Sequence, residues 1–120
     1  MYRLRNNAWV RLADMATGRR GHSCIFYMEN IWIMDGTDGA SVEKYNLMTN
    51  TWTSGTSMPS SVEYGEAIVF NGTIYLANPA DGKVMKLVNQ TTWEYVTNIG
   101  QFGFRALFPA PVVAANYLNC

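Results

Sequence analysis

Apolar and polar residues alternate along this chain in short runs that are separated by turn-forming residues. Residues 22–28 are almost continuously apolar, as expected for a strand that is covered on both faces. Three shorter runs follow at 31–34, 41–46 and 51–54, divided by segments rich in Gly, Asp and Asn. No stretch keeps a 3.6-residue periodicity over ten residues or more, so the pattern predicts four short strands and no helix.

The same order of elements occurs a second time further along the chain. The second set of predicted strands covers residues 66–70, 73–77, 84–88 and 92–96. Asn71-Gly72 lies between the first two of them and is a strong two-residue hairpin signal, because both central positions of a type I′ turn need a positive φ. The chain therefore contains two consecutive four-strand units.

Tryptophan marks the period of the repeat. Trp9, Trp52 and Trp93 lie 43 and 41 residues apart, and both Tyr2 and Tyr45 stand seven residues before a tryptophan. A period of 40 to 50 residues is typical of propeller blades or helical solenoids, and the strand pattern favours blades. The regular spacing predicts that each tryptophan packs in the core at an equivalent position of its unit.

The two ends of the chain match parts of the same unit. Residues 1–15 match its last two strands, and residues 105–120 match its first strand and the beginning of its second. The chain is thus expected to be all-β, with a half blade at 1–15, full blades at 19–58 and 62–99, and the start of a further blade at 105–120.

The repeat resembles the kelch motif over nearly the entire chain. The family unit contains Arg-x-Gly-His, a strand, an Ile-Tyr pair, a Gly-rich loop, Val-Glu-x-Tyr-Asp, a turn with Thr, a Trp and, six residues later, a Met. The residues at these places are Arg19, Gly21, His22, Ile31, Trp32, Val42, Glu43, Tyr45, Asn46, Thr49, Trp52 and Met58. The resemblance implies antiparallel four-stranded blades of a β-propeller, usually with six blades.

Two departures from the motif indicate a divergent member of the family. The double glycine of the motif is Asp35-Gly36 in the first unit and Asn78-Pro79 in the second. The arginine at position 19 is replaced by Val62 in the second unit. Residue roles of better matched relatives therefore transfer only weakly to this chain.

The composition limits the classes of partner and the compartment. The formal net charge is zero, which gives no basis for binding nucleic acid or a membrane surface. Cys24 and Cys120 are too few for a disulfide framework and are expected to act as small buried apolar residues. The N-terminal residues show no apolar segment of a signal peptide, so a cytoplasmic protein is expected, although sequons at Asn71 and Asn89 leave an extracellular location open.

The sequence shows no constellation of residues for catalysis, metal binding or a cofactor. His22 is the only histidine and has no second ligand at metal-binding spacing. No serine has the surroundings of a nucleophile. Asp35, Asp38 and Asp81 occur in loops and are interpreted as turn formers, with a polar rim for a ligand as the alternative.

The resemblance also implies where a partner would bind. Kelch propellers usually contact partners through loops that join consecutive blades, here 16–21 and 59–64, and through loops between the second and third strands, here 35–40 and 78–83. The candidate contact residues are Arg19, Arg20, Thr37, Asp38, Glu63, Tyr64, Asp81 and Arg105. Arg and Tyr are among the residue types that dominate binding energy at interfaces.

The leading functional hypothesis is a protein-interaction module that presents these loops to a protein or peptide. By resemblance, such modules serve as substrate-recognition domains of ubiquitin-ligase adaptors or as actin-associated scaffolds. The alternative is part of a kelch-containing enzyme, such as a copper-radical oxidase, with its active site supplied outside this segment. The expectation is that this segment is not itself an enzyme.

Two full blades and two partial ones do not close a six-bladed ring. The favoured explanation is that the chain is a piece of a longer protein. A second is a homodimer, in which the N-terminal strands of one copy complete the blade that the C-terminus of the other begins. An open monomer is the third.

Overall fold

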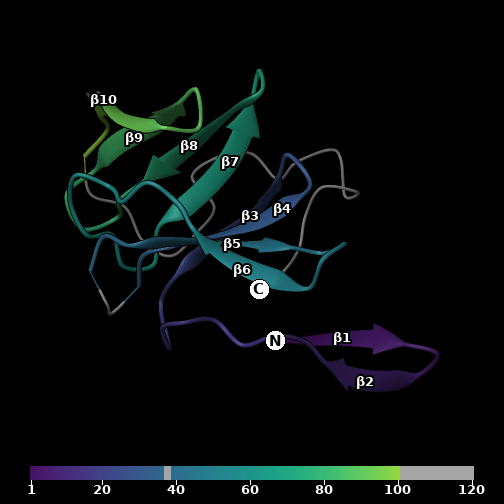
Figure 1. Cartoon of the computed structure of the whole chain (residues 1–120). Helices are drawn as coiled ribbons and strands as arrows, with labels where there is room; N and C mark the ends of the chain where they lie inside the picture. The colour runs from purple at the N-terminus through teal and green to yellow at the C-terminus, as the bar shows by residue number, and fades with distance from the viewer. Residues whose placement is uncertain (37–38, 101–120) are drawn as a thin grey trace.

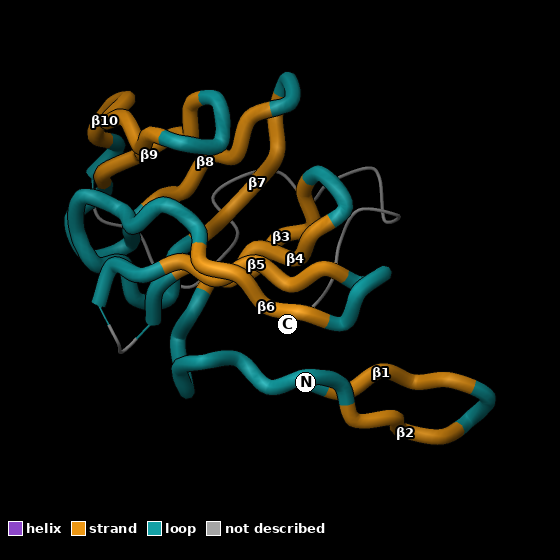
Figure 2. The backbone as a smooth tube through the Cα atoms, in the orientation of Figure 1, coloured by secondary structure: helices purple, strands orange, loops and turns teal. Residues whose placement is uncertain are grey.

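The computed structural model describes residues 1–36 and 39–100. Within these ranges the chain forms antiparallel strands only, arranged as one two-stranded and two four-stranded sheets (Figure 1, Figure 2). No helix in the described part is long and apolar enough to cross a bilayer. The predicted all-β architecture of four-stranded antiparallel sheets is confirmed.

The first blade is built from residues 23–54. Its strands are paired in chain order. They are β3 (Ser23–Tyr27), β4 (Asn30–Met34), β5 (Val42–Asn46) and β6 (Thr51–Ser54). These bounds agree with the four predicted strands to within one residue at each end. Tyr45 lies opposite Trp52 in the β5–β6 register, and their rings are 5.0 Å apart.

The second blade repeats this order over residues 66–98. Its strands are β7 (Glu66–Phe70), β8 (Thr73–Ala77), β9 (Lys83–Val88) and β10 (Thr92–Asn98). Asn71 and Gly72 have φ values of 48° and 72°, so the predicted hairpin turn with two positive φ angles is confirmed. In the β9–β10 register, Leu87 lies opposite Trp93.

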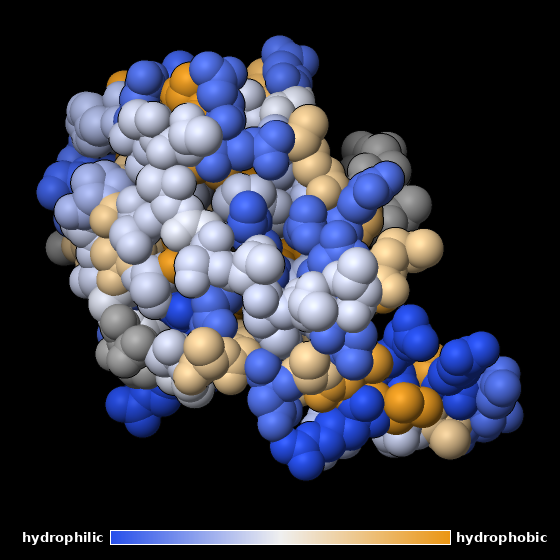
Figure 3. All heavy atoms as spheres, viewed as in Figure 1, coloured by the Kyte–Doolittle hydropathy of each residue, from blue (hydrophilic) through white to orange (hydrophobic). Residues whose placement is uncertain are grey.

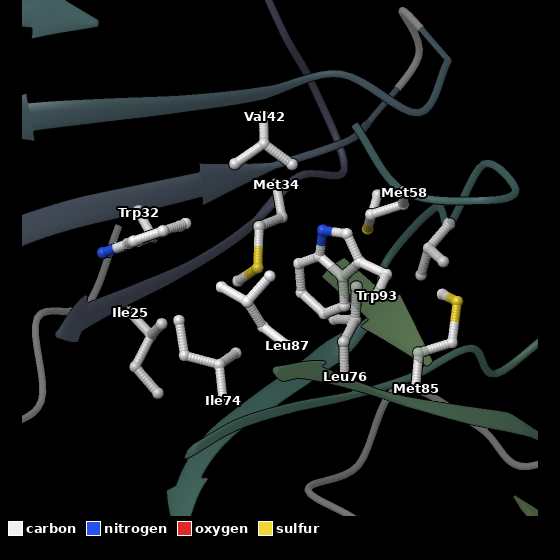
Figure 4. Packing of buried hydrophobic residues seen from close by; sticks show 11 residues of the cluster. Ile25, Trp32, Met34, Val42, Met58, Ile74, Leu76, Met85, Leu87 and Trp93 are labelled. Atoms are coloured by element: carbon white, nitrogen blue, oxygen red, sulfur yellow. The ribbon is translucent and has the colours of Figure 1, made fainter. Parts of the chain in front are cut away.

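A continuous apolar core joins the two blades (Figure 4). The first blade contributes Trp32 and Met34, and the second contributes Leu76 and Leu87, all at most 2% exposed. Met58, from the linker between the blades, completes the contact. β3 and β7, the first strands of the two blades, lie side by side. The two blades therefore pack against each other through buried side chains. The loops at their edges are supported by this core.

Two of the repeated tryptophans each fasten the linker that comes from the preceding unit. The indole N–H of Trp52 donates to the carbonyl of Ala13 at 2.8 Å, and that of Trp93 donates to the carbonyl of Thr56 at 2.9 Å. Each acceptor lies four residues after the tryptophan of the previous unit. This contact explains the regular spacing of the tryptophans, because every unit needs one indole to hold the chain that enters it.

Trp9 does not share this environment. It lies in a separate hairpin of β1 (Tyr2–Arg5) and β2 (Ala8–Arg11) that projects away from the blades (Figure 1). Trp9 is 71% exposed, whereas Trp93 is 8% exposed. The prediction that all three tryptophans pack in the core is therefore wrong for Trp9. Its burial requires strands of a further blade, and the described part of the chain provides none beside the hairpin.

The hairpin register also corrects the alignment of the first unit. Trp9 lies opposite Leu4, as Trp52 lies opposite Tyr45 and Trp93 opposite Leu87. The turn at Asn6-Asn7 is shorter than the turns of the two blades, so Tyr2, at seven residues' distance, is not the equivalent of Tyr45. Figure 3 shows apolar side chains over this hairpin, where Leu4 and Val10 are 56% and 40% exposed.

Two further expectations concern the C-terminal part and the cysteines. The partial blade predicted at 105–120 lies outside the described residues, as does Cys120. Cys24 on β3 is disulfide-bonded, which differs from the expectation of a reduced, buried apolar side chain.

Candidate functional site

Loops from both blades and from both linkers meet at one edge of the molecule. The first linker, residues 12–22, leads into the first blade, and the second linker, residues 55–65, joins the two blades. The β4–β5 loop contacts the second linker, since the Gly36 N–H donates to the carbonyl of Val62 at 3.4 Å. The β8–β9 loop contacts the same linker through the Asn78 side chain, which donates to the carbonyl of Ser61 at 3.5 Å. We call this surface, formed by the described residues of 16–21, 35–40, 59–64 and 78–83, the loop face.

The loop face contains a cavity of about 350 Å³. The described residues in its wall are Gly36, Gly39, Ser61, Glu63, Asn78 and Ala80. The two glycines and Ala80 bring mainly backbone to the wall, and the larger side chains in it are polar. The volume lies at the lower end of the range for pockets that hold small ligands, which suits a single side chain or a small polar group.

Arg19 differs from its expected role as an exposed contact residue, because the structure buries its guanidinium. The Arg19 side chain is 1% exposed, and its Nη2 lies 3.0 Å from a carboxylate oxygen of Glu43, itself 8% exposed. It also donates to the backbone carbonyls of Asp35 and Ser41 and to the Ser41 hydroxyl. Arg19 therefore fixes the first linker and the β4–β5 loop to β5, and it has no exposed donor to offer a partner.

Asp35 lies under the loop face as a buried carboxylate. It is 0% exposed, and in the described part of the chain neither of its carboxylate oxygens accepts a hydrogen bond. Burial raises the pKa of Asp35 to about 7, and repulsion from Glu63 adds to this, although the Arg19 guanidinium and the nearby Gly36 N–H lower it. The turn-forming role expected for Asp35 is therefore not the one that its side chain has.

Asn78 occupies the equivalent position in the second blade. The backbone N–H of Asp35 donates across its loop to Ser41, and that of Asn78 donates across its loop to Lys83. The Asn78 side chain accepts from the Ala80 N–H and donates to Ser61. The Asn78 amide is thus hydrogen-bonded at the position where the Asp35 carboxylate of the first blade has no hydrogen bond in the described part of the chain.

The remaining predicted contact residues are distributed over the loop face. Arg20 and Glu63 are exposed, and Glu63 lines the cavity. Tyr64 is 50% exposed and donates its N–H to the Gly21 carbonyl at 2.6 Å. Thr37, Asp38 and Arg105 lie outside the described residues. That any of these residues contacts a partner stays a prediction.

Asp81 has the turn-forming geometry expected of it. Its carboxylate accepts from the Lys83 N–H at 3.0 Å and lies 3.1 Å from the Lys83 ammonium. The hydrogen bond from the Lys83 backbone holds the pKa of Asp81 below its usual value.

Sequence reasoning missed most of the cavity wall. Ser61 and Asn78 were not singled out as contacts, nor were Gly36, Gly39 and Ala80. A signal for Asn78 was present, because it stands where the first unit has Asp35. The others contribute mainly by where their backbone lies, and residue type does not reveal that.

His22 lies close to Gly36 of the β4–β5 loop. Its Nδ1 is buried and has no hydrogen-bond partner in the described part of the chain. Burial lowers the pKa of His22, and the Arg19 guanidinium lowers it further. Within residues 1–36 and 39–100, no three His, Cys, Asp or Glu side chains come together in a group that could hold a metal ion.

Comparison with known proteins identifies the repeat. A family model described as the kelch motif matches residues 18–59. The chain is 35% identical to beta-scruin of Limulus polyphemus over 77 residues, which cover 60% of this chain and 8% of that protein. It is 28% identical to kelch-like protein 35 of Mus musculus over 78 residues, which cover 62% of this chain and 14% of that protein. The chain thus matches only a small part of each of these relatives.

A solved structure shows the same architecture at a larger scale. The structure of YjhT superposes with a TM-score of 0.64 and 17% sequence identity, and the match covers 85% of this chain and 44% of that one. At this identity the likeness concerns the fold alone. Residues 18–59 carry the kelch motif, and the chain is a partial kelch-like segment that is similar to beta-scruin and to kelch-like protein 35.

Proposed function

We propose that this chain is a protein-interaction module that binds a protein or peptide through its loop face. The observation that carries the proposal is the cavity, which is formed jointly by loops of both blades and the linker between them. Loops held by a rigid scaffold are where recognition residues tend to lie. The kelch-repeat relatives support an interaction role, as do substrate adaptors and scaffolds that contain such repeats. We propose binding rather than catalysis for this segment.

Replacing Arg20 and Glu63 together by alanine is expected to reduce partner retention. Both side chains are exposed on the loop face, and truncating the minority of interface residues that carry the binding energy costs more than about 1 kcal/mol, or about fivefold in affinity. The immobilised chain would be incubated with lysate of its source organism, and the retained proteins would be quantified by mass spectrometry.

The matched control is Lys86→Ala with Glu94→Ala. It also removes one cation and one anion, from a partly exposed pair on β9 and β10. The proposal would be supported if the wild type and the control retain a protein equally and the loop-face variant retains about fivefold less of it. Equal retention by all three chains would contradict it.

We also propose that two copies of the chain associate through the N-terminal hairpin. Leu4 is 56% exposed there, whereas its equivalents Tyr45 and Leu87 are 1% and 2% exposed. β1 and β2 correspond to the third and fourth strands of a blade. In both complete blades the third strand also pairs with a second strand, but among the described strands β1 pairs only with β2. The matched part of this chain covers 44% of the YjhT chain, so two copies would supply most of the strands of such a fold.

The wild-type chain is therefore expected to be a dimer in solution, and Leu4→Glu is expected to be a monomer. The charge would be placed in the contact that buries the equivalent residue in a complete blade. Size-exclusion chromatography with light scattering measures the mass directly. Met48→Glu is the control, because Met48 is 88% exposed in the β5–β6 turn and should leave the mass unchanged. A monomeric wild type would refute the association and leave the loop-face proposal intact.

A further inference from the structure

Several hydrogen-bond donors in the wall of the loop-face cavity are engaged within the chain. The Gly36 N–H donates to Val62, and the Ala80 N–H donates to the Asn78 side chain. The Asn78 amide donates to the carbonyl of Ser61. Anion sites in loops are built from free backbone N–H groups that converge on the ligand. In this wall the N–H groups of Gly36, Asn78 and Ala80 donate to other groups of the chain.

The charges around the cavity point in the same direction. Glu63 lines the cavity, and no salt bridge holds its carboxylate within the described part of the chain. Asp35, which directly precedes Gly36 of the wall, is a second carboxylate with no hydrogen bond there. Arg19 is a cation close to Asp35, and its guanidinium is bound to Glu43. A cavity with unpaired carboxylates at and behind its wall therefore favours a cation.

Burial makes the need for a counter-ion at this place stronger. Asp35 is fully buried, and a charge acts on a buried carboxylate more strongly than it would in water. Repulsion from Glu63 acts on Asp35 in the free chain. A positive group in the cavity would oppose this repulsion and would form a charge-assisted hydrogen bond with Glu63.

We infer that the cavity of the loop face binds a cationic side chain, lysine or arginine, that the protein or peptide partner inserts between Glu63, Ser61 and Asn78. This inference rests on the proposed function and names the chemistry of the partner residue. The volume of about 350 Å³ suits one long side chain, and the open mouth on the loop face leaves the rest of the partner to contact the surrounding loops.

The test is selection of displayed random heptapeptides on the full 120-residue chain, on Glu63→Gln and on Glu94→Gln. Glu63→Gln keeps the shape of the cavity and removes its charge. Glu94→Gln removes the same charge from β10, so it controls for general electrostatic attraction. Peptides selected on the wild type and on Glu94→Gln are expected to be enriched in Lys or Arg at one position, and those peptides are expected to bind Glu63→Gln about tenfold more weakly.

The second readout is the titration of the Asp35 carboxyl by NMR with and without one selected basic peptide. A cation in the cavity would lower the pKa of Asp35, whereas a peptide bound elsewhere would leave it unchanged. Selected peptides without basic enrichment, no selected peptides, or equal affinity for Glu63→Gln and Glu94→Gln would each overturn the inference. These outcomes are distinct from failure of the proposed function, which the retention experiment with Arg20 and Glu63 decides.

Discussion

Replacing Arg19 by valine is expected to lower the free energy of unfolding by about 3–5 kcal/mol. The change removes the buried partner of Glu43 and leaves that carboxylate with a single hydrogen bond, from the Ala16 N–H. It also leaves the carbonyls of Asp35 and Ser41 without the donor that Arg19 gives them. Denaturation by urea, followed by tryptophan fluorescence, measures the loss.

The second blade shows how the same place is filled without charge. Val62 stands at the position of Arg19, and the strand register places Met85 where the first blade has Glu43, because Glu43 pairs with Ile33 and Met85 with Leu76. Val62 and Met85 are 1% and 2% exposed and belong to the core cluster. The Arg19–Glu43 ion pair of the first blade and the apolar pair of Val62 and Met85 in the second therefore occupy equivalent positions.

The double variant Arg19→Val, Glu43→Met is consequently expected to recover most of the lost stability. Breaking a buried ion pair is far more destabilising than replacing both partners by apolar side chains. The remaining loss is expected to be about 1–2 kcal/mol, since the Ala16 N–H loses its acceptor and the carbonyls of Asp35 and Ser41 still lack the Arg19 donor. Arg11→Ala is the control, because its pair with Asp14 is 66% and 61% exposed and should leave the transition unchanged. If the double variant lost as much free energy of unfolding as Arg19→Val and Glu43→Met lose together when each is made alone, this account would be contradicted.

The strands of both blades could be predicted from the sequence because their signals are local. Alternating apolar residues and the Asn71-Gly72 turn determine strand bounds over a few residues. Trp52 and Trp93 were predicted correctly as packed residues for the same reason, since each acts within its own unit and the linker before it. Trp9 has the same local pattern, but its burial depends on strands outside the described residues, and no spacing reveals whether they are present.

The candidate site was harder to predict because it depends on contacts between distant residues. Arg19 was expected to be a candidate partner contact, whereas its ion-pair partner Glu43 lies 24 residues away in the sequence, on β5. The cavity wall combines backbone from loops of two blades, so glycine and alanine contribute to it without any chemical signal of their own. Only the general location of the face, the meeting of the two loop sets, followed from the repeat.

Replacing Asp35 by asparagine is expected to stabilise the protein at neutral pH and to have no stabilising effect at pH 4. The folded-state pKa of Asp35 is raised from 3.8 to about 7, so the folded protein binds this proton more tightly than the unfolded chain does. The wild type therefore loses stability as the pH rises from about 4 to about 7, and the asparagine variant does not.

The pKa of Asp35 sets an upper limit on the stability that Asp35→Asn can gain. Each pKa unit corresponds to about 1.4 kcal/mol, which limits the gain above pH 7 to about 4 kcal/mol, and we expect about half of that because the amide must also be desolvated. Asn78 shows that an amide fits this position, where it donates to the linker carbonyl of Ser61. Arg19 keeps its partner Glu43 in the variant, so no new buried charge is left alone.

Thermal unfolding of Asp35→Asn and Asp81→Asn between pH 4 and pH 8 tests the prediction. Asp81 is the matched control, since the Lys83 hydrogen bond lowers its pKa. Its removal should therefore destabilise the protein near neutral pH, and this loss should shrink as the pH falls. Opposite signs for two aspartates of equivalent loops would follow only from their surroundings, because the substitution is the same. A loss of stability in Asp35→Asn that is equal at pH 4 and pH 8 would instead mean that the carboxylate is held by a partner at both pH values.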